Sequence, residues 1–267
     1  MSLCPAVLSI AGSDSGGGAG IQADLKTISA LGGFATTALT CITAQTPDAV
    51  SGIVALDPAM VTLQIKAVCE GFPIAAAKTG MLYSAEIIHA VAAADVQEGI
   101  PVLVVDPVMV AASGARLLRD DAVAALCEAL IPHARVITPN LHEAEILCGH
   151  RIETVDQLAR AAREIGERFD VACVAKGGHL SGLEVVDVLY DAGEEFQFSS
   201  PRILCSSTHG AGCAFSAALA TFLARGELLA HAVSQAKHFV AEALRTTETV
   251  GRHHPLKFFH GRGAPAS

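Results

Sequence analysis

Short apolar runs alternate with segments of helical periodicity along most of this 267-residue chain, and this alternation limits the possible folds more than any other feature. Each apolar run predicts a buried strand, and each periodic segment predicts a helix that covers the strands. Strands separated by helices pair in parallel, with helices on both faces of the sheet. We therefore expect an α/β protein, a three-layer α/β/α sandwich with a mostly parallel central sheet. It should form one domain over residues 1–267, with a flexible tail at about 261–267.

The predicted strands are bounded by glycine, proline or polar residues, which are frequent in turns. They are Ala6–Ala11, Thr37–Thr43, Ala75–Thr79, Pro101–Val105, Arg135–Thr138 and Val171–Ala175. Two further strands, Glu184–Tyr190 and Glu195–Ser199, should form a hairpin around Ala192-Gly193. The predicted helices are Ile21–Leu31, Met60–Glu70, Ser84–Ala94, Asp120–Leu130, Thr154–Phe169, and one that begins near Cys213 and ends before Gly226.

The bulk composition excludes several classes of function. A net charge of −9 argues against a nucleic-acid-binding surface, although it allows a local phosphate pocket. No apolar run reaches the roughly 18 residues that a membrane helix needs. The eight cysteines form no Cys-x-x-Cys pair, and without a signal peptide they fit a reducing compartment. We expect a cytoplasmic protein that binds neither nucleic acid nor membrane.

The glycines near the N-terminus do not match the common nucleotide-binding motifs. The run from Gly16 to Gly20 is followed by Ile21, so the Gly-x-Gly-x-x-Gly pattern of dinucleotide sites is not satisfied. The chain also lacks the Gly-x-x-x-x-Gly-Lys-Ser/Thr loop of P-loop enzymes. If the protein binds ATP, the phosphates must be held elsewhere, and Thr208–Cys213 is the best candidate.

A short segment, Ser206–Cys213, leads directly into an apolar helical pattern that includes Phe215 and Leu219. Gly210–Cys213 should therefore lie at a helix N-terminus, where free N–H groups and the helix dipole make an anion site. A thiol in such a place tends to have a lowered pKa, which predicts a reactive Cys213. The same pattern also fits a tight loop before a buried helix, with Cys213 as a core residue.

Polar residues gather where the predicted strands end. In open α/β sheets, ligands bind along that edge. The residues that follow a strand in this way are Ser13, Asp14, Gln45, Lys78, Asp106, Asn140, Glu143 and Lys176. Their common position predicts a binding site at this edge more strongly than any one residue does.

Several segments closely resemble, in order, the signatures of hydroxymethylpyrimidine/phosphomethylpyrimidine kinases, a family of the ribokinase-like superfamily. They are Ala11–Thr27, Thr43–Thr46, Lys78–Leu82, Val105–Val110, Thr138–Ala144, Lys176–His179 and Gly210–Cys213. The matches cover nearly the whole chain. The resemblance implies a ribokinase-like fold, a homodimer and an ATP-dependent enzyme of thiamine biosynthesis. Such an enzyme phosphorylates 4-amino-5-hydroxymethyl-2-methylpyrimidine, and then its monophosphate to the diphosphate.

The resemblance assigns the catalytic roles to the segment before the last predicted helix. Cys213 matches the position of the catalytic base, which is Asp in most ribokinase relatives and takes the proton from the substrate hydroxyl. Gly210, Ala211 and Gly212 belong to the anion hole, in which Ala211, Gly212 and Cys213 should offer N–H groups to the transferring phosphoryl. The family more often has threonine at the position of Ala211, and this change leaves the backbone donors in place.

The resemblance assigns the pyrimidine contacts to Gly12, Asp24, Gln45, Met81 and Val108. A carboxylate and an amide can pair with the ring nitrogen and the exocyclic amine, and a buried polar site rejects analogues that leave it unpaired. Other interpretations stay open: Asp24 as an acidic residue in a first helical turn, Gln45 as a turn residue, and Met81 and Val108 as core.

The resemblance assigns ATP binding to Asp106, Asn140, Lys176 and Thr208, and Mg²⁺ to Asp106 and Glu143. Hard carboxylate oxygens suit Mg²⁺, usually through water. Asn140 and Glu143 also form an Asn-x-x-Glu pattern that predicts a helix cap. Lys176 could instead be a solvated lysine at a strand end, and Lys78 could be structural.

Two other functions remain open from the sequence. Some proteins of this subgroup phosphorylate vitamin B6, so a pyridoxal/pyridoxine kinase is the nearest alternative. A protein that binds the pyrimidine without turnover is the second, although Cys213, Asp106 and Lys176 are all present. Residues 111–118 should form a mobile flap over the site. His209 should have a simple loop role.

Overall fold

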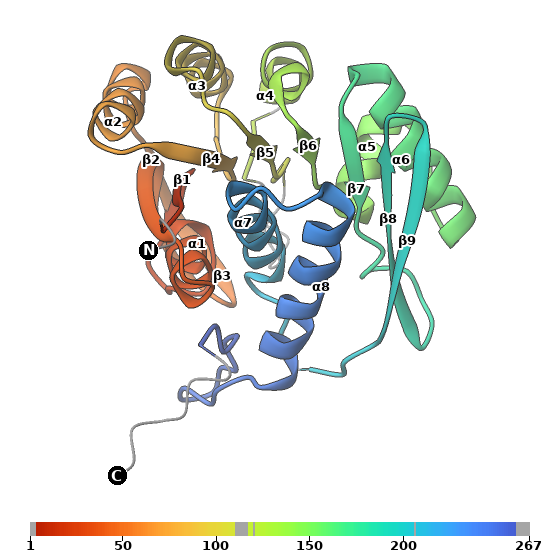
Figure 1. The fold of residues 1–267 in the computed structure, drawn as a ribbon. Coiled ribbons are helices and arrows are strands. Elements are labelled where there is room, and N and C mark those ends of the chain that lie inside the picture. The colour runs from red at the N-terminus through yellow and green to blue at the C-terminus, as the bar shows by residue number, and fades with distance from the viewer. Residues whose placement is uncertain (1–3, 110–116, 120, 206, 260–267) are drawn as a thin grey trace.

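The computed structural model, which describes residues 4–109, 117–119, 121–205 and 207–259, places one sheet between two layers of helices (Figure 1). Within these ranges the strand order is β3-β2-β1-β4-β5-β6-β7-β8-β9. The strands are β1 (Ala6–Asp14), β2 (Phe34–Thr46), β3 (Ala49–Ala55), β4 (Ile74–Thr79), β5 (Leu103–Val105), β6 (Val136–Ile137), β7 (Ala172–Ala175), β8 (Glu184–Asp191) and β9 (Glu194–Pro201). The pairs from β2 to β7 are parallel, and β3, β8 and β9 are antiparallel additions at the two sides. The predicted mostly parallel sheet is confirmed.

The helices cover both faces of the sheet (Figure 1). They are α1 (Gly20–Ala30), α2 (Pro58–Gly71), α3 (Ala85–Glu98), α4 (Ala122–Ala125), α5 (Leu141–Cys148), α6 (Val155–Phe169), α7 (Ala211–Ala224) and α8 (Leu229–Arg245). One apolar core packs α1, α7 and α8 against the sheet, and the other packs α2 to α6. Side chains of successive strand residues pack into opposite cores, since Val7 belongs to the first core and Leu8 to the second. The predicted three-layer arrangement is confirmed.

Some elements differ from the prediction. β3 and α8 were not predicted, and β2 extends at both ends beyond Thr37–Thr43. The helix predicted over Asp120–Leu130 includes the short α4 and continues as a π-helical turn, Leu126–Leu130. Residues 111–116 of the predicted flap and the predicted tail at 261–267 lie outside the described residues.

Reciprocal side-chain caps fix where α5 and α6 begin. Asn140 Oδ1 accepts the Glu143 N–H at 3.0 Å, and Glu143 Oε2 accepts the Asn140 N–H at 2.8 Å. Thr154 and Gln157 form the same arrangement at the start of α6. Each pair satisfies N–H groups that a helix start leaves free. The predicted capping role of Asn140 and Glu143 is confirmed, and it holds Glu143 at the carboxyl edge of the sheet.

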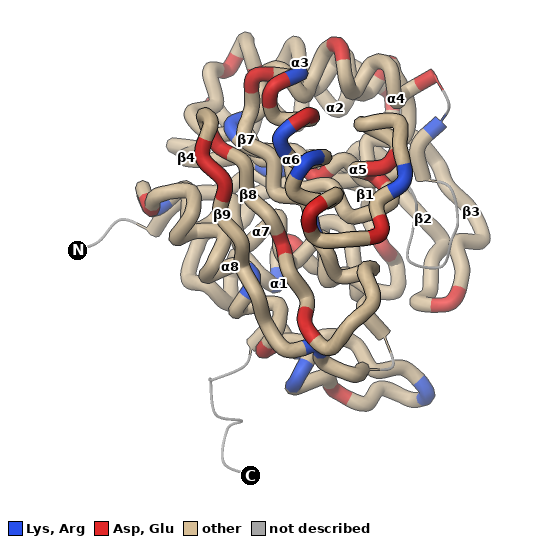
Figure 2. The backbone as a smooth tube through the Cα atoms, turned by 90° about the vertical axis from the view of Figure 1, so that its right-hand side faces the viewer, with Lys and Arg blue, Asp and Glu red and all other residues tan. Residues whose placement is uncertain are grey.

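Acidic and basic positions occur on several helices and strands of the view in Figure 2, and some lie next to one another along the chain. None of the helices in the described ranges is both long and apolar enough to cross a bilayer.

Asp95, on α3, is a buried carboxyl group with an incomplete set of partners. Its side chain is 7% exposed, and its Oδ1 atom accepts no hydrogen bond from the described residues. Burial raises the pKa of Asp95 from 3.8 to about 6, although His133 opposes this shift. The ionised carboxylate therefore weakens the fold at neutral pH.

We predict that Asp95→Asn makes the free energy of unfolding less dependent on pH. Because the pKa is higher in the folded state, the protonated carboxyl stabilises the fold fully below pH 3.8, and this stabilisation is lost as pH rises through about 6. The full effect is roughly 3 kcal/mol for a shift of about two pKa units. Urea unfolding at pH 5 and pH 8 should show the wild type losing about 1 kcal/mol more than the variant. Equal losses would contradict this explanation.

Candidate active site

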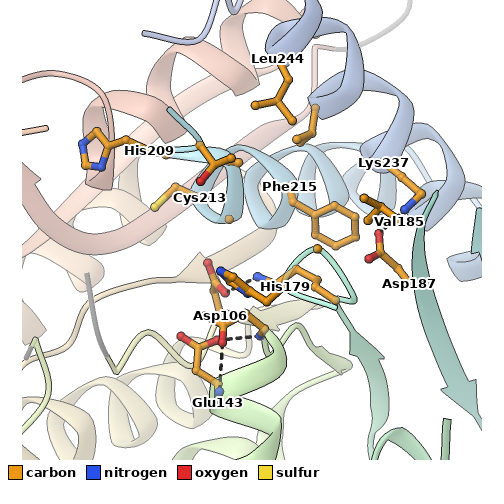
Figure 3. A pocket seen from close by; sticks show the side chains of 18 of the residues that line it. Asp106, Glu143, His179, Val185, Asp187, His209, Cys213, Phe215, Lys237 and Leu244 are labelled. Atoms are coloured by element: carbon orange, nitrogen blue, oxygen red, sulfur yellow. Dashed lines mark hydrogen bonds and ion pairs between the residues drawn. The ribbon is translucent and has the colours of Figure 1, made fainter. Parts of the chain in front are cut away.

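A cleft with a volume of about 570 Å³ opens at the edge where the parallel strands end (Figure 3). Its walls come from the end of β2, from the loops after β5, β6 and β7, from the starts of α5 and α7, and from α8. The predicted site residues that line it are Gln45, Asp106, Val108, Asn140, Glu143, Lys176, Thr208, Gly210, Ala211, Gly212 and Cys213. Most of the predicted site residues therefore meet in one cleft.

Gly12 and Met81 lie outside the lining of this cleft. A side chain at Gly12 would come within 2.7 Å of Cys41 Sγ and 3.4 Å of Met81 Sδ. Met81 is buried in a small apolar cluster with Cys41 and Leu117, and Leu117 itself lines the cleft. Gly12 and Met81 thus stand behind the cleft wall, and a direct contact of either with substrate stays a prediction.

Asp24 also lies outside the lining, and its side chain is committed to Lys78. Both carboxylate oxygens lie 2.9 Å from Lys78 Nζ, and Ser9 Oγ donates to one of them at 2.6 Å. Burial alone would lower the pKa of Lys78, but Asp24, Cys213 and Asp106 together raise it, so the lysine stays an ammonium. Asp24 thus forms an internal ion pair, and its direct contact with the pyrimidine stays a prediction. The alternative position of Asp24 in a first helical turn is wrong, because α1 has no acidic residue there.

The start of α7 has the form of an anion site. Gly210 is the N-cap at φ 84°, and a side chain there would collide with the backbone of the loop before α1, so glycine is required. Because Gly210 has no side chain to cap the helix, the N–H groups of Gly212 and Cys213, which have no cap among the described residues, can be offered to an anion. Ala211 differs from the prediction, since it donates its N–H to the carbonyl oxygen of Thr208 at 3.0 Å. The predicted set of three donors is reduced to two.

The Cys213 thiol has a higher pKa than its place at a helix N-terminus predicts. Burial raises the pKa of Cys213 to about 11, and the nearby Lys78 ammonium offsets this in part. The carboxylates of Asp24 and Asp106 add to the rise. The predicted lowering is wrong because loss of hydration outweighs the helix dipole at this position. The thiol is therefore protonated at neutral pH.

The carboxylate of Asp106 connects three parts of the cleft. Its Oδ1 accepts hydrogen bonds from Thr138 and Lys176, each at 3.2 Å, and its Oδ2 accepts one from Ser216 at 3.0 Å. A side chain at Gly212 would lie 3.5 Å from Lys176 Nζ, which places this cation beside the start of α7. Burial alone would lower the pKa of Lys176, but Asp106 and Glu143 together with Cys213 raise it. With its side chain 15% exposed, Lys176 is a fixed cation and not a solvated lysine.

Glu143 faces the same network from α5. Its Oε2 accepts the Asn140 N–H at 2.8 Å, and its Oε1 accepts the Met109 N–H at 3.4 Å. Burial raises the pKa of Glu143 to about 7. The positive charge of Lys176 opposes this rise, and the like charge of Asp106 adds to it. Two carboxyl groups and one ammonium thus share a poorly hydrated wall of the cleft.

The glycine-rich loop before α1 surrounds an internal carboxylate. Asp14 accepts N–H groups from Gly16, Gly18 and Ala19 at 2.8, 3.1 and 2.8 Å. His209 Nε2 lies 3.1 Å from Asp14 Oδ2. Burial would raise the pKa of Asp14, but His209 and the backbone donors lower it. His209, predicted to have a simple loop role, therefore joins the loop before α1 to the loop before α7.

A buried ion pair at the far end of the cleft was not predicted. Asp187 of β8 and Lys237 of α8 lie 2.8 Å apart, and Asp187 also accepts the Gly177 N–H at 2.9 Å (Figure 3). Two features of the sequence could have predicted this ion pair. Asp187 interrupts an otherwise apolar strand, and Lys237 follows Val233 by one helical turn, on the buried face of α8.

Comparison with known proteins identifies the relatives of this chain. The model of the phosphomethylpyrimidine kinase family matches residues 14–257. The chain is 43% identical over 248 residues to the hydroxymethylpyrimidine/phosphomethylpyrimidine kinase of Bacillus subtilis and covers 92% of it, with 92% of this chain aligned. It is 46% identical over 248 residues to the thiamine biosynthesis bifunctional protein ThiED of Geobacter sulfurreducens. That alignment covers 93% of this chain and spans about half, 51%, of the relative.

The fold is shared with a solved kinase structure. The pyridoxal kinase from Staphylococcus aureus, in complex with AMP-PCP and pyridoxal, superposes with a TM-score of 0.89 at 33% identity, covering 98% of this chain and 96% of that one. The ribokinase-like fold and the kinase class expected from the sequence are therefore confirmed. This chain belongs to the phosphomethylpyrimidine kinase family and is a phosphotransferase.

Proposed function

We propose that the protein uses ATP to phosphorylate the hydroxymethyl group of 4-amino-5-hydroxymethyl-2-methylpyrimidine, and then its monophosphate to the diphosphate. The observation that carries the proposal is the meeting of the α7 N-terminus, the Lys176 cation and the Cys213 thiol in one cleft. Phosphoryl transfer requires stabilised negative charge and an acceptor hydroxyl that loses its proton. Family membership and the AMP-PCP complex of the S. aureus relative support ATP as the donor.

The transferring phosphoryl group would lie at the start of α7. The N–H groups of Gly212 and Cys213 would donate to it, and Lys176 Nζ adds a full positive charge beside them. Asn140 and Thr208 line the same cleft and would contact the ATP phosphates. Because Asp106 holds Lys176 in place, little reorganisation is needed as charge develops.

Cys213 would take the proton of the substrate hydroxyl. Its raised pKa means that a small fraction of the enzyme holds the thiolate at neutral pH, but a base of high pKa accepts a proton strongly. The Lys78 ammonium favours the thiolate, and Asp24 in turn fixes Lys78. We therefore assign Asp24 a supporting role through Lys78, in place of a direct contact with the pyrimidine.

The pyrimidine ring would bind at the end of the cleft formed by Gln45 and Val108. The Gln45 amide can both donate to and accept from an aminopyrimidine, which suits the ring nitrogen and the exocyclic amine. Val108 supplies an apolar contact, and Gly12 and Met81 shape the wall behind.

The residues present fit a magnesium ion that is held through water. Asp106 and Glu143 supply buried hard oxygen ligands, and burial raises the pKa of Glu143, with the like charge of Asp106 adding to the rise. Their oxygens already accept hydrogen bonds, so coordination through retained water is the better fit. Bound Mg²⁺ would neutralise phosphate charge. Asp106 and Glu143 would hold it, while the Lys176 ammonium offsets part of the negative charge of these two carboxyl groups.

Two other possibilities bear on this proposal. Kinase membership disfavours a pyrimidine-binding protein without turnover. A pyridoxal kinase stays the main alternative, because the S. aureus structural relative binds pyridoxal in the same fold. The homodimer expected from the resemblance also remains a prediction. The β2–β3 hairpin exposes Ile42 and Val54, which could serve such an interface.

We predict that purified protein with Mg-ATP releases ADP with hydroxymethylpyrimidine and with its monophosphate, and much more slowly with pyridoxal. The amide of Gln45 matches the aminopyrimidine edge, which pyridoxal lacks. A coupled ADP assay with each substrate separately makes the comparison. Turnover of pyridoxal alone would assign the protein to vitamin B6 phosphorylation, and no turnover of any of the three would overturn the proposed function.

We predict that Cys213→Ala lowers kcat/KM by about 100-fold or more, because a positioned general base accelerates the reaction by ~10²–10⁴-fold. In the wild type, kcat/KM should rise roughly tenfold per pH unit between pH 7 and 9, since the pKa of the thiol is about 11. Cys213→Asp supplies a base of low pKa and should remove this rise. Cys205→Ala serves as the matched control and should keep wild-type kinetics. Unchanged turnover in Cys213→Ala would exclude the thiol as base.

We predict that Lys176→Met lowers kcat by about 100-fold or more, because it removes a charge aimed at the transferring phosphoryl. Lys66→Met removes a half-exposed lysine paired with Glu70 and should leave kcat unchanged. Steady-state kinetics at varied ATP concentration separate an effect on kcat from an effect on the KM for ATP. A raised KM for ATP with an unchanged kcat would show that Lys176 binds ATP without stabilising the transition state.

A further inference from the structure

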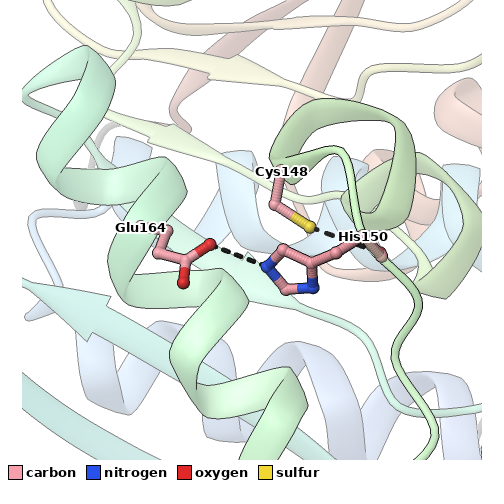
Figure 4. A group of neighbouring side chains, drawn as sticks. All are labelled: Cys148, His150 and Glu164. Atoms are coloured by element: carbon pink, nitrogen blue, oxygen red, sulfur yellow. Dashed lines mark hydrogen bonds and ion pairs between the residues drawn. The ribbon is translucent and has the colours of Figure 1, made fainter.

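We propose that Cys148, His150 and Glu164 bind one Zn²⁺ ion on the outer surface of the α5–α6 layer. A thiol sulfur, a ring nitrogen and a carboxylate oxygen of these residues lie within 4.8 Å of one another (Figure 4). The cluster is separate from the cleft, because none of the three residues lines it. His150 and Glu164 are about half exposed, so an ion can reach them from solvent.

The cluster has nearly the dimensions of a tetrahedral zinc site. Zinc bound at about 2.0–2.3 Å holds its ligand atoms roughly 3.3–3.8 Å apart. His150 Nε2 and Glu164 Oε2 are already 2.8 Å apart, and the thiol lies within the same small volume (Figure 4). Closure around an ion therefore needs only side-chain movement.

The hydrogen bonds of His150 favour a cation at this point. Its Nε2 faces Glu164 Oε2 at 2.8 Å, and its Nδ1 faces the carbonyl oxygen of Arg151 at 3.4 Å. A neutral imidazole can donate from one nitrogen only, so the nitrogen that faces the second acceptor carries a lone pair, which a proton or a metal ion can occupy. Zinc would replace the proton on Nε2, while Nδ1–H keeps the carbonyl. Zinc-bound histidines are oriented by this kind of bond.

The backbone that carries the ligands is well fixed. Gly149, at φ 80°, ends α5 and turns the chain sharply after the cysteine. The Glu145 side chain accepts the N–H of Ile152 at 2.9 Å, which closes the loop back onto α5. Arg168 of α6 donates to the carbonyl oxygen of Leu147 at 3.0 Å, which ties the two helices together. A site on such a support is held in place before the metal arrives.

The donor set selects the metal. One sulfur, one nitrogen and one oxygen suit zinc, which accepts all three and often keeps water in its fourth position. The Cys148 thiol now makes a weak contact with the carbonyl oxygen of His150 at 3.6 Å. On binding, the thiol proton and the proton on His150 Nε2 pass to solvent, and the metal joins α5 to α6. Because Asn140, the N-cap of α5, lines the cleft, the ion would anchor the opposite end of this helix.

The test is a titration of metal-free protein with Zn²⁺, without nucleotide or Mg²⁺. Calorimetry measures the binding, and thermal unfolding measures the Tm with and without the metal. Wild type should bind one more equivalent of Zn²⁺ than Cys148→Ser and Glu164→Gln, and its Tm should rise with the metal. Affinity at this site should fall by roughly 100-fold or more in each variant, since loss of a group that only orients a ligand already costs about 10–100-fold. Co²⁺ in place of Zn²⁺ should give a thiolate charge-transfer band in the wild type.

Matched controls separate this site from other cysteines and histidines. Cys4→Ser removes an exposed thiol, and His231→Gln removes a second exposed His–Glu pair, with nitrogen and oxygen 3.0 Å apart. Both should bind like the wild type. Equal zinc stoichiometry in the wild type and Cys148→Ser, or a cobalt–thiolate band that persists in Cys148→Ser, would overturn the proposal. Kinase activity is not part of this readout, so the outcome is independent of the proposed function.

Discussion

The cleft depends on one buried carboxylate, that of Asp106, which accepts hydrogen bonds from Thr138 after β6, Lys176 after β7 and Ser216 on α7. Each donor comes from a different segment, so the carboxylate sets how α7 sits against the sheet. A buried carboxylate is stable only when its charge is matched, and Lys176 supplies that match. The same arrangement keeps a cation beside the helix N-terminus. The stability of this wall and the proposed anion binding therefore rest on the same ion pair.

The sequence was sufficient for the architecture and for most of the cleft. Apolar runs predicted the parallel strands, and strand ends predicted the edge where Gln45, Asp106 and Lys176 now meet. Local chemistry also predicted the cap formed by Asn140 and Glu143, because both partners lie three residues apart. Such features depend on near neighbours in the chain or on the general geometry of α/β sheets. They can be derived without knowledge of tertiary contacts.

The errors, and the features that were not predicted, concern properties that depend on distant contacts. The pairing of Asp24 with Lys78 joins residues 54 positions apart, and no local pattern shows that both become fully buried. The pKa of Cys213 was predicted from the helix dipole, yet burial determines its direction. The Ala211 N–H donates to the carbonyl oxygen of Thr208 in a turn that the sequence did not predict, so it is not free for an anion. β3 was missed because its residues are mostly exposed, which removes the alternation of buried and exposed side chains.

The contact between His209 and Asp14 has a consequence for the order in which the protein is assembled. It joins residues 195 positions apart, so the two loops cannot meet until most of the chain has been synthesised. During translation, the early strands and helices can form while the anion site does not yet exist. Closing so long a segment costs conformational entropy that must be recovered by late contacts. A nascent chain that has not yet reached His209 lacks the proposed anion site, so phosphate binding at that site would report completion of folding.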